Sequence, residues 1–376
     1  MIYLDNSATT IPDRAVADEI YNMLTVNFGN PSSFHKAGLD ANAKLREARA
    51  SVAKLLGCES EEVYFTSGGT EANNLAIMGA AQALKRRGKR IVTTAIEHES
   101  VLQTVDELEK QGFEVVRLMP DREGNITKAQ IAEAVTADTI LVSMMYVNNE
   151  VGSVLPVEFI RKAVQRAGAN ALVHIDCVQA FGKIPVRPSK LGADLVSVTA
   201  HKIHGAKGVG ALYVKKGVRI LPQQFGGEQE KKLRPGTEAI PLIAGFGKAC
   251  ELASDLDKIA ANMAQINAYA RENLLAIDGV AINSPDNASD YIINFYVPVF
   301  MTSQTVVQHL SSKYGICISN GSACAKGKKS HVLTAMKLPD NTIERSVRVS
   351  FSRNTTKDDV DALVTAIKET VEDYKQ

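Results

Sequence analysis

Short apolar runs alternate with amphipathic stretches through the first two thirds of the chain. The runs Thr139–Tyr146, Ala171–Asp176 and Asp194–Thr199 have the length and apolar character of strands that are buried on both faces. This alternation predicts an α/β fold in which helices cover both sides of a mainly parallel sheet. The elements expected before these runs are strand Glu62–Thr66, helix Glu71–Arg87, strand Ile91–Ala95, helix Ser100–Gln111 and strand Phe113–Leu118.

The pattern changes after about Ala239. A long helical stretch is expected from about Ile240 to Ile277, and an amphipathic helix, Lys357–Tyr374, lies near the end of the chain. Separated strands are expected between them, at Tyr291–Tyr296, Cys317–Ser319 and Ser346–Phe351. This order of elements predicts a second, smaller α+β domain. We therefore predict a large domain over residues 13–250, and a small domain made of residues 1–12 and 251–376.

Composition and charge are those of an ordinary globular protein. The 376 residues are 45% hydrophobic, and a formal net charge of +1 gives no general attraction to nucleic acids or membranes. No signal peptide or membrane-length apolar run is visible, so we expect a cytoplasmic protein without a membrane or nucleic-acid partner. The cysteines are scattered without a CxxC pair, which argues against a disulfide framework or a zinc ribbon, and we expect no metal site. They are Cys58, Cys177, Cys250, Cys317 and Cys324.

Two predicted strand ends carry a lysine and an aspartate. Lys202 follows the strand Asp194–Thr199, and Asp176 ends the strand before it. In open parallel sheets, ligands bind beyond the carboxyl ends of the strands. A lysine that forms a Schiff base and an aspartate that holds the pyridinium nitrogen are the minimum equipment for pyridoxal phosphate chemistry. Two alternatives stay open: a solvated surface lysine, and an aspartate that caps a helix starting near Val178.

Residues suited to binding a phosphate group occur at two strand ends, one of which is the end that carries Lys202. Gly69 and Thr70 stand between a predicted strand and a predicted helix, where free backbone N–H groups and the helix dipole favour an anion. Thr199 and His201 adjoin Lys202 and give a second candidate. An ordinary Gly-Gly turn is the alternative for the first. The sequence contains no GxxxxGK[ST] motif, which argues against nucleotide hydrolysis.

A histidine, His98, follows the predicted strand Ile91–Ala95. Its ring could stack on a cofactor and exchange protons near neutral pH. The flanking residues Glu97 and Glu99 make a solvated loop histidine an equal alternative. A metal-binding role is disfavoured, because no other histidine or cysteine lies at ligand spacing from it.

A candidate nucleophile, Cys324, lies in the most loop-like stretch of the chain, Gly321–Ser330. Positive charge on Lys326, Lys328 and Lys329 would favour its thiolate, which is the nucleophilic form. Cysteines without such neighbouring charges are mostly small buried hydrophobic residues. We expect small buried hydrophobic residues at Cys58, Cys250 and Cys317.

An arginine, Arg348, lies within the predicted strand Ser346–Phe351. Its planar guanidinium could bind a substrate carboxylate through two parallel hydrogen bonds. A surface ion pair is the alternative.

Together these motifs resemble the cysteine desulfurases of the class V aminotransferase family, in its nitrogen-fixation and iron–sulfur-assembly branch. The resemblance extends over nearly the whole chain. Three departures, none of which removes a reacting group, are Cys177 for a usual Ala, Asn320 for a Ser and Ala206 for a common Pro. The matching segments are Tyr3–Thr10, Phe28–Ser33, Thr66–Asn74, Glu97-His98, Val147–Gly152, His201–Ile203, Arg234–Thr237 and Gly321–Cys324.

The resemblance implies a fold-type-I, aspartate aminotransferase-like protein. It implies a homodimer whose active site lies at the subunit interface. Pyridoxal 5'-phosphate would be bound covalently to Lys202, and Asp176 would hold its pyridinium nitrogen. Gln179 would face the phenolic oxygen of the cofactor, and His98 would stack on its ring.

The resemblance also implies a reaction and its residues. L-cysteine would be converted to L-alanine, and its sulfur would pass to Cys324 as a persulfide, with Lys202 and His98 as further catalytic residues. The sulfur acceptor would be an iron–sulfur scaffold protein or a tRNA-thiolation enzyme. Asn149 would contact the cofactor, and together with Arg348 it would hold the substrate. The implied phosphate contacts are Gly69, Thr70, Thr199, His201 and, from the other subunit, Thr237.

Three other functions stay open from the sequence. A selenocysteine lyase would use the same residues as a cysteine desulfurase. A class V aminotransferase would not need the thiol of Cys324. A cofactor-binding regulator or sulfur carrier without enzyme activity would not need Lys202.

Overall fold

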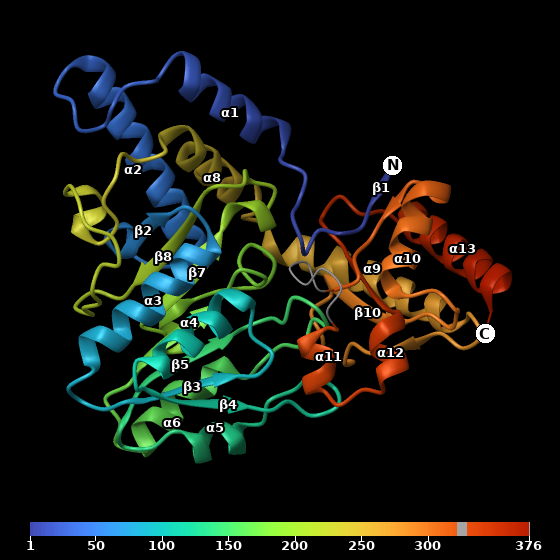
Figure 1. Cartoon of the computed structure of the whole chain (residues 1–376). Helices are drawn as coiled ribbons and strands as arrows, with labels where there is room; N and C mark the ends of the chain where they lie inside the picture. Colours follow the sequence, from blue (N-terminus) through green and yellow to red (C-terminus); the bar gives the residue numbers. More distant parts are fainter. Residues whose placement is uncertain (322–328, 376) are drawn as a thin grey trace.

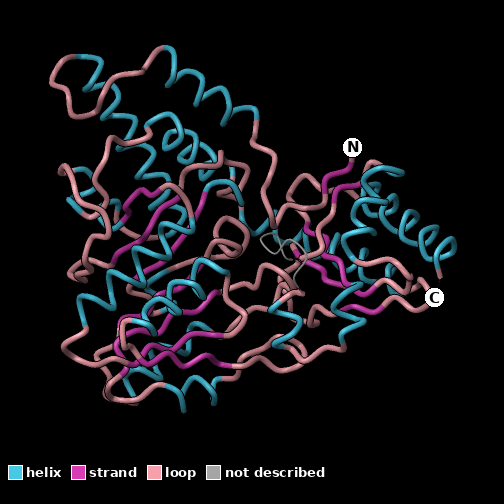
Figure 2. The backbone as a smooth tube through the Cα atoms, viewed as in Figure 1, coloured by secondary structure: helices cyan, strands magenta, loops and turns pink. Residues whose placement is uncertain are grey.

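The computed structural model describes residues 1–321 and 329–375. The predictions for Cys324, Lys326 and Lys328 lie outside these residues. Figure 1 shows two parts, a larger one built around an extended sheet and a smaller one that contains both chain termini. Their strands form two separate groups (Figure 2). In the described ranges, no helix is both long and apolar enough to cross a membrane.

A seven-stranded sheet forms the core of the larger part. Strand β8 runs antiparallel to both neighbours, and the other strands run parallel to one another. β5, β7 and β8 are buried along their whole length, which explains their unbroken apolar runs. The predicted mainly parallel sheet is confirmed. The strand order is β2 (Val63–Thr66), β8 (Gly210–Val214), β7 (Leu195–Thr199), β6 (Leu172–Asp176), β5 (Thr139–Met145), β3 (Arg90–Thr94) and β4 (Glu114–Leu118).

Helices cover both faces of this sheet. They are α1 (Arg14–Thr25), α2 (Lys36–Leu56), α3 (Gly69–Leu84), α4 (Glu99–Lys110), α5 (Lys128–Ala134), α6 (Ile160–Arg166), α7 (Pro188–Leu191) and α8 (Ile240–Leu252). Successive side chains of a strand point to opposite faces, so neighbouring residues of β3 enter different cores. Ile91 packs in a cluster with residues of α3 and α4, whereas Val92 belongs to the main core with residues of α2, α6 and α8.

The smaller part combines two short sheets with the remaining helices. A three-stranded antiparallel sheet has the order β12 (Ser346–Ser350), β10 (Ile292–Tyr296) and β9 (Ala281–Ile282). The N-terminal strand β1 (Ile2–Tyr3) pairs in parallel with β11 (Ile316–Cys317). This pairing is compatible with a small domain that contains residues 1–12. The predicted domain limits themselves stay a prediction. The helices are α9 (Leu256–Leu275), α10 (Ser303–His309), α11 (His331–Ala335), α12 (Asp340–Arg345) and α13 (Lys357–Tyr374).

The long helix expected from Ile240 to Ile277 is wrong, because the structure divides it into α8 and α9. Asp255, between them, has a φ of −87° and a ψ of 65°, outside the helical region. The hydroxyl of Ser254 donates to the carbonyl of Glu251 at 2.8 Å. Such side-chain bonds to the backbone compete with the helical pattern and favour a break at these polar residues.

Of the three cysteines expected to be buried, only Cys250 is fully buried. Cys250 lies buried on α8, but Cys58 and Cys317 are half-buried, so the expectation of full burial was wrong for these two. Cys58 directly follows the left-handed glycine that ends α2, and Cys317 ends the short strand β11. Both positions are ends of elements, where side chains are only partly covered.

Candidate active site

A cavity of about 310 Å³ lies at the carboxyl ends of the parallel strands. Asp176 ends β6 and Thr199 ends β7, whereas His98 and Asn149 follow β3 and β5. The topology therefore collects side chains that are far apart in the sequence. The predicted site residues that line the cavity are Gly69, Thr70, His98, Asn149, Asp176, Gln179, Thr199, His201, Lys202 and Arg348.

Two predicted residues stand apart from this group. Thr237 is exposed in the single chain and does not line the cavity. Its contact with the cofactor of a second subunit stays a prediction. Cys324 lies outside the described residues.

Asp176 is held in a turn directly after β6. Its Oδ1 accepts a hydrogen bond from the backbone N–H of Val178 at 2.9 Å, and its Oδ2 accepts one from Asn73 Nδ2 at 2.7 Å. The helix-cap alternative was wrong, because the described residues after Asp176 form turns. Burial raises the pKa of Asp176, while these two hydrogen bonds oppose the shift. A positively charged partner in the cavity would favour the ionised carboxylate.

A hydrogen-bonded chain connects Asp176 to His98. Asn73 Nδ2 also donates to Ser100 Oγ at 2.9 Å, and this hydroxyl lies 2.9 Å from Nδ1 of His98. The same Nδ1 accepts a hydrogen bond from the backbone N–H of Ser100, so His98 caps the start of α4. Because Nδ1 is an acceptor, the proton of the neutral ring lies on Nε2. Burial lowers the pKa of His98. The solvated-loop alternative was therefore wrong.

The start of α3 forms one wall of the cavity. A β-carbon at Gly69 would lie 2.7 Å from Cγ2 of Val178, so the helix can begin this close to the turn after β6 only with glycine. The first-turn N–H groups of a 16-residue helix carry partial positive charge, which favours an anion here. His201 lines the same cavity. Burial and the charge of Lys202 lower the pKa of His201 to about 3, so its ring is neutral.

Lys202 lies half-buried in a short 3-10 turn that follows β7. Its Nζ donates to the carbonyl oxygens of Ser7 and Ala8, the latter at 2.8 Å. Burial, together with the charges of Arg348 and Lys183, lowers the pKa of Lys202 to about 7. The amine is thus partly neutral and nucleophilic at neutral pH. The alternative of a solvated surface lysine was wrong.

The side chain of Arg348 is 1% exposed on β12. Its Nη2 lies 2.7 Å from Asp5 Oδ1, and its Nη1 donates to the carbonyl oxygen of Asn149 at 2.7 Å and of Gly321 at 3.3 Å. The surface ion pair considered from the sequence is therefore a buried one. The Nε of Arg348 is buried and has no partner among the described residues.

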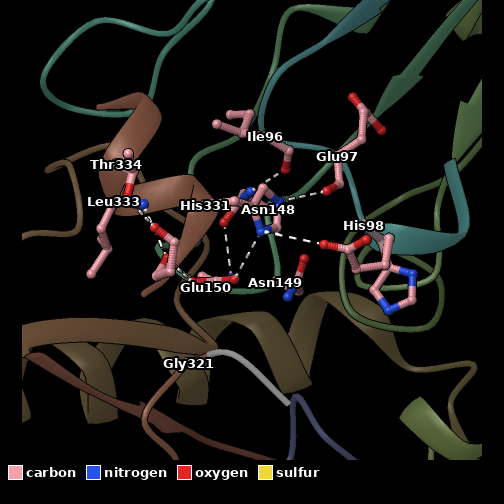
Figure 3. Close-up of polar contacts among 12 residues, drawn as sticks. Ile96, Glu97, His98, Asn148, Asn149, Glu150, Gly321, His331, Leu333 and Thr334 are labelled. Carbon is pink, nitrogen blue, oxygen red and sulfur yellow. Dashed lines mark hydrogen bonds and ion pairs between the residues drawn. The ribbon is translucent and has the colours of Figure 1, made fainter. Parts of the chain in front are cut away.

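The turn that carries Asn149 is fixed by its neighbours. Asn148 Nδ2 donates to the carbonyl oxygen of Ile96 at 2.9 Å, just before His98 in the chain. Figure 3 shows Asn148 between this segment and His331 of α11. The Nε2 of His331 lies 2.9 Å from the carbonyl oxygen of the residue that precedes His98. These contacts hold Asn149 and His98 on neighbouring walls of the cavity.

One of the three lysines expected to favour the Cys324 thiolate, Lys329, is described. Its Nζ lies 3.1 Å from Asp340 and 3.1 Å from Glu344. Since two carboxylates compensate its charge, Lys329 has little left for a thiolate elsewhere. In residues 1–321 and 329–375, no cluster of three or more His, Cys, Asp or Glu side chains could hold a metal ion.

Asp5, Ser7 and Asn73 shape the cavity but were not predicted from the sequence. Asn73 had a readable signal, because it is a polar residue on the buried, mostly apolar side of α3, where it needs partners. Asp5 lies within a motif that was noticed, but its partner could not be identified without the fold. Ser7 acts through its backbone carbonyl, which no residue type encodes.

Comparison with known proteins agrees with this geometry. The profile of the family Aminotransferase class-V matches residues 2–363. The chain belongs to this family. Its members are enzymes that depend on pyridoxal phosphate, and both the resemblance noted in the sequence and the predicted fold class are confirmed.

Individual relatives match over nearly the whole chain. The chain is 40% identical to the cysteine desulfurase IscS of Dictyoglomus turgidum, over 99% of this chain and 94% of that protein. A solved NifS-like protein is 36% identical, with a TM-score of 0.92 and 99% coverage of both chains. The structure of SspA in complex with cysteine is 33% identical, with a TM-score of 0.83, and the match covers 95% of this chain and 100% of that one.

We predict that the amine of Lys202 titrates near pH 7 in the cofactor-free protein, since burial and neighbouring cations lower its pKa to about 7. It should become reactive as the pH rises through that value. Competitive acetylation at a series of pH values, read by mass spectrometry, measures this, with the exposed Lys190 as internal reference. Arg348→Gln should raise the pKa of Lys202 by removing a positive charge. A titration at the ordinary lysine value of 10.5 would contradict this prediction.

Proposed function

We propose that this protein is a cysteine desulfurase, which converts L-cysteine to L-alanine and receives the sulfur on Cys324 as a persulfide. The observation that carries the proposal is that Lys202, Asp176 and Arg348 line one cavity, as a partly neutral amine, a buried carboxylate and a buried guanidinium. A cysteine desulfurase at 40% identity and a structural relative solved with cysteine support the choice of substrate.

The cavity residues fit pyridoxal 5'-phosphate. Asp176 provides the anion that a pyridinium nitrogen needs, Lys202 the amine for a covalent bond, and the start of α3 the N–H groups for a phosphate. Within the described residues, Ser7 Oγ and Asn73 Oδ1 are buried without a partner, and both residues line the cavity. The cofactor, when bound, supplies an electron sink for negative charge at the substrate Cα.

The remaining assignments follow from positions around the cavity. Gln179 would donate to the phenolic oxygen, and the neutral ring of His98 would stack on the cofactor ring. Thr237 would come from the second subunit. The proposed phosphate contacts are Gly69, Thr70, Thr199, His201 and Thr237.

Arg348 is suited to bind the substrate carboxylate, with Asn149 beside it. Its buried Nε–H has no partner among the described residues, so a carboxylate oxygen there would satisfy it. Because the pKa of Lys202 is about 7, its amine can accept a proton from the substrate Cα and return it at neutral pH.

The sulfur step balances with the residues of the chain. The Cys324 thiolate attacks the substrate sulfur, the new S–S bond forms, and the substrate Cβ–S bond breaks. The electron pair of that bond remains on the carbon side, which takes up a proton and becomes alanine. The thiolate is thereby oxidised to a persulfide, which an acceptor thiol can remove by exchange. An iron–sulfur scaffold protein or a tRNA-thiolation enzyme are the proposed acceptors.

A homodimer is supported by an exposed apolar surface. Large apolar side chains are exposed on and between α1 and α2, and the exposed fraction reaches 96% for Phe34. Monomeric proteins rarely leave such a cluster uncovered. A second copy would cover this surface. Thr237 does not line the cavity of its own chain, and in a dimer it could lie at the cavity of the other copy. We define this α1–α2 surface by Tyr21, Leu24, Val26, Phe28, Phe34 and Leu39.

Incubation with L-cysteine, with alanine and sulfide measured together, tests the proposed function. Brief exposure of the wild type without reductant should add one sulfur atom to the peptide that contains Cys324. Cys324→Ala should bind the cofactor and the substrate, because neither step uses the thiol, but should lose at least ~100-fold in turnover.

The matched control is Cys317→Ala, which should keep its activity. Sulfur found on Cys177 or Cys317, together with an active Cys324→Ala variant, would refute the assignment. If Cys324→Ala loses sulfur transfer but still transfers amino groups, the result would favour the class V aminotransferase alternative.

We predict that Arg348→Lys lowers kcat/KM for L-cysteine by about 10- to 100-fold. Lysine keeps a positive charge beside Asp5 but cannot form two parallel hydrogen bonds to a carboxylate. Most of the change should be a rise in KM, and the bound-cofactor spectrum should persist. Arg353→Lys, an equivalent change at a residue that does not line the cavity, is the control. An unchanged kcat/KM would place Arg348 outside the substrate site.

The dimer prediction concerns the α1–α2 surface. Phe34→Glu should weaken self-association, because a charge would have to be buried between the two copies. Light scattering coupled to size-exclusion chromatography measures the mass of the particle. Phe300→Glu, at an equally apolar but separate exposed site in the smaller part, should leave the dimer intact. Dissociation by Phe300→Glu alone would place the interface elsewhere.

A further inference from the structure

A second lysine beside the cavity, Lys183, is buried. It is 5% exposed and follows Gln179 by four residues. Its Nζ donates to Gln179 Oε1 at 3.0 Å and lies 5.4 Å from the centre of the Tyr291 ring. No carboxylate forms an ion pair with Lys183 among the residues described. Buried lysines are rare without such a partner, so this one needs an explanation.

The amide of Gln179 is held between two groups of opposite hydrogen-bonding character. Its Oε1 accepts from Lys183, and its Nε2 donates to the carbonyl oxygen of Ser7 at 2.9 Å. A backbone carbonyl can only accept, and an ammonium group can only donate. Turning the amide by half a rotation would place oxygen against oxygen and NH₂ against the ammonium. The contacts therefore specify one orientation from both ends.

The position of Lys183 separates its role from that of the cavity residues. Gln179 and Ser7 line the main cavity, and Lys183 does not. Lys183 instead lines a smaller cavity of about 20 Å³, together with Lys202, His204 and Arg353. Lys183 thus contacts the main cavity only through the side chain of Gln179, although its charge also lowers the pKa of Lys202. The Gln179 NH₂ group has one hydrogen on Ser7, which leaves the other for a ligand.

We propose that Lys183 is a positioning residue that holds the Gln179 amide with its NH₂ group toward the cofactor. The proposal rests on the proposed function, because the group served is the phenolic oxygen of the cofactor. Without Lys183, the amide would lose the partner that specifies its oxygen, and its donor would face the cofactor for only part of the time.

Several charged and titratable groups surround Lys183 and influence its protonation. Burial and the charge of Arg348 lower the pKa of Lys183 to about 7. Lys202, His204 and Arg353 line the same small cavity, and Tyr291 packs against the amine. The N–H groups of a neutral amine still donate to Oε1, and Ser7 maintains the other end. A neutral amine can also accept from the NH₂ group, however, so the preference for this orientation is strongest while Lys183 is protonated.

The test is a pH titration of the visible absorption band of the bound cofactor in the holoenzyme. A donor to the phenolic oxygen stabilises its anionic form, so losing that donor should raise the apparent pKa of the band. Gln179→Leu should raise it by on the order of one pH unit, and Lys183→Met should shift it in the same direction. The double variant should shift less than the sum of the two single variants, because only the direct effect of the Lys183 charge remains once Gln179 is replaced.

Two further variants separate the outcomes. Lys190→Met removes one exposed lysine charge near the same segment and should leave the band unchanged. If Lys183→Met yields little folded protein, Lys183→Gln provides the same comparison, because it also removes the donor-only group. Additive shifts in the double variant, or no shift from the Lys183 variants, would overturn the positioning role. A wild-type protein that binds no cofactor would instead overturn the proposed function.

Discussion

The buried guanidinium of Arg348 joins the segments that enclose the cavity. It pairs with Asp5 of the N-terminal segment and donates to the carbonyl oxygens of Asn149, in the turn after β5, and Gly321. A charge that is 1% exposed is stable only when such partners surround it. The N-terminal residues are therefore required at the cavity, and with them come the carbonyl groups that hold Lys202. The smaller part of the protein thus completes a site whose other walls belong to the larger sheet.

Positive charge dominates this enclosed region, and that balance suits anionic ligands. Lys202, Lys183 and Arg348 act on one another, and the nearby carboxylates of Asp5 and Asp176 compensate them only in part. Burial and mutual repulsion keep the pKa of both lysines at about 7. A phosphate and a substrate carboxylate would supply the missing negative charge. Burial and the neighbouring cations by themselves favour a neutral, reactive amine at Lys202.

Much of the fold could be predicted from the sequence, because buried parallel strands appear as unbroken apolar runs and their ends mark the ligand site. Lys202 and Asp176 were found in this way. The break between α8 and α9 was missed, since the short polar segment around Asp255 interrupts an otherwise continuous helical pattern. The amide of Gln179 and the carbonyl of Ser7 meet only through the tertiary structure. A polar residue pattern can indicate a site, but not which backbone groups complete it.

Neutral acceptors, rather than a carboxylate, hold the amine of Lys202. Its Nζ donates to the carbonyl oxygens of Ser7 and Ala8. A direct ion pair would fix the ammonium form and raise the pKa of the lysine, whereas carbonyl groups orient the amine with a smaller effect on its protonation. The Ser7 carbonyl also accepts from Gln179, through its second lone pair. When Lys202 moves to bond a ligand, this contact can remain, so the nucleophile can leave while the wall beside it keeps its shape.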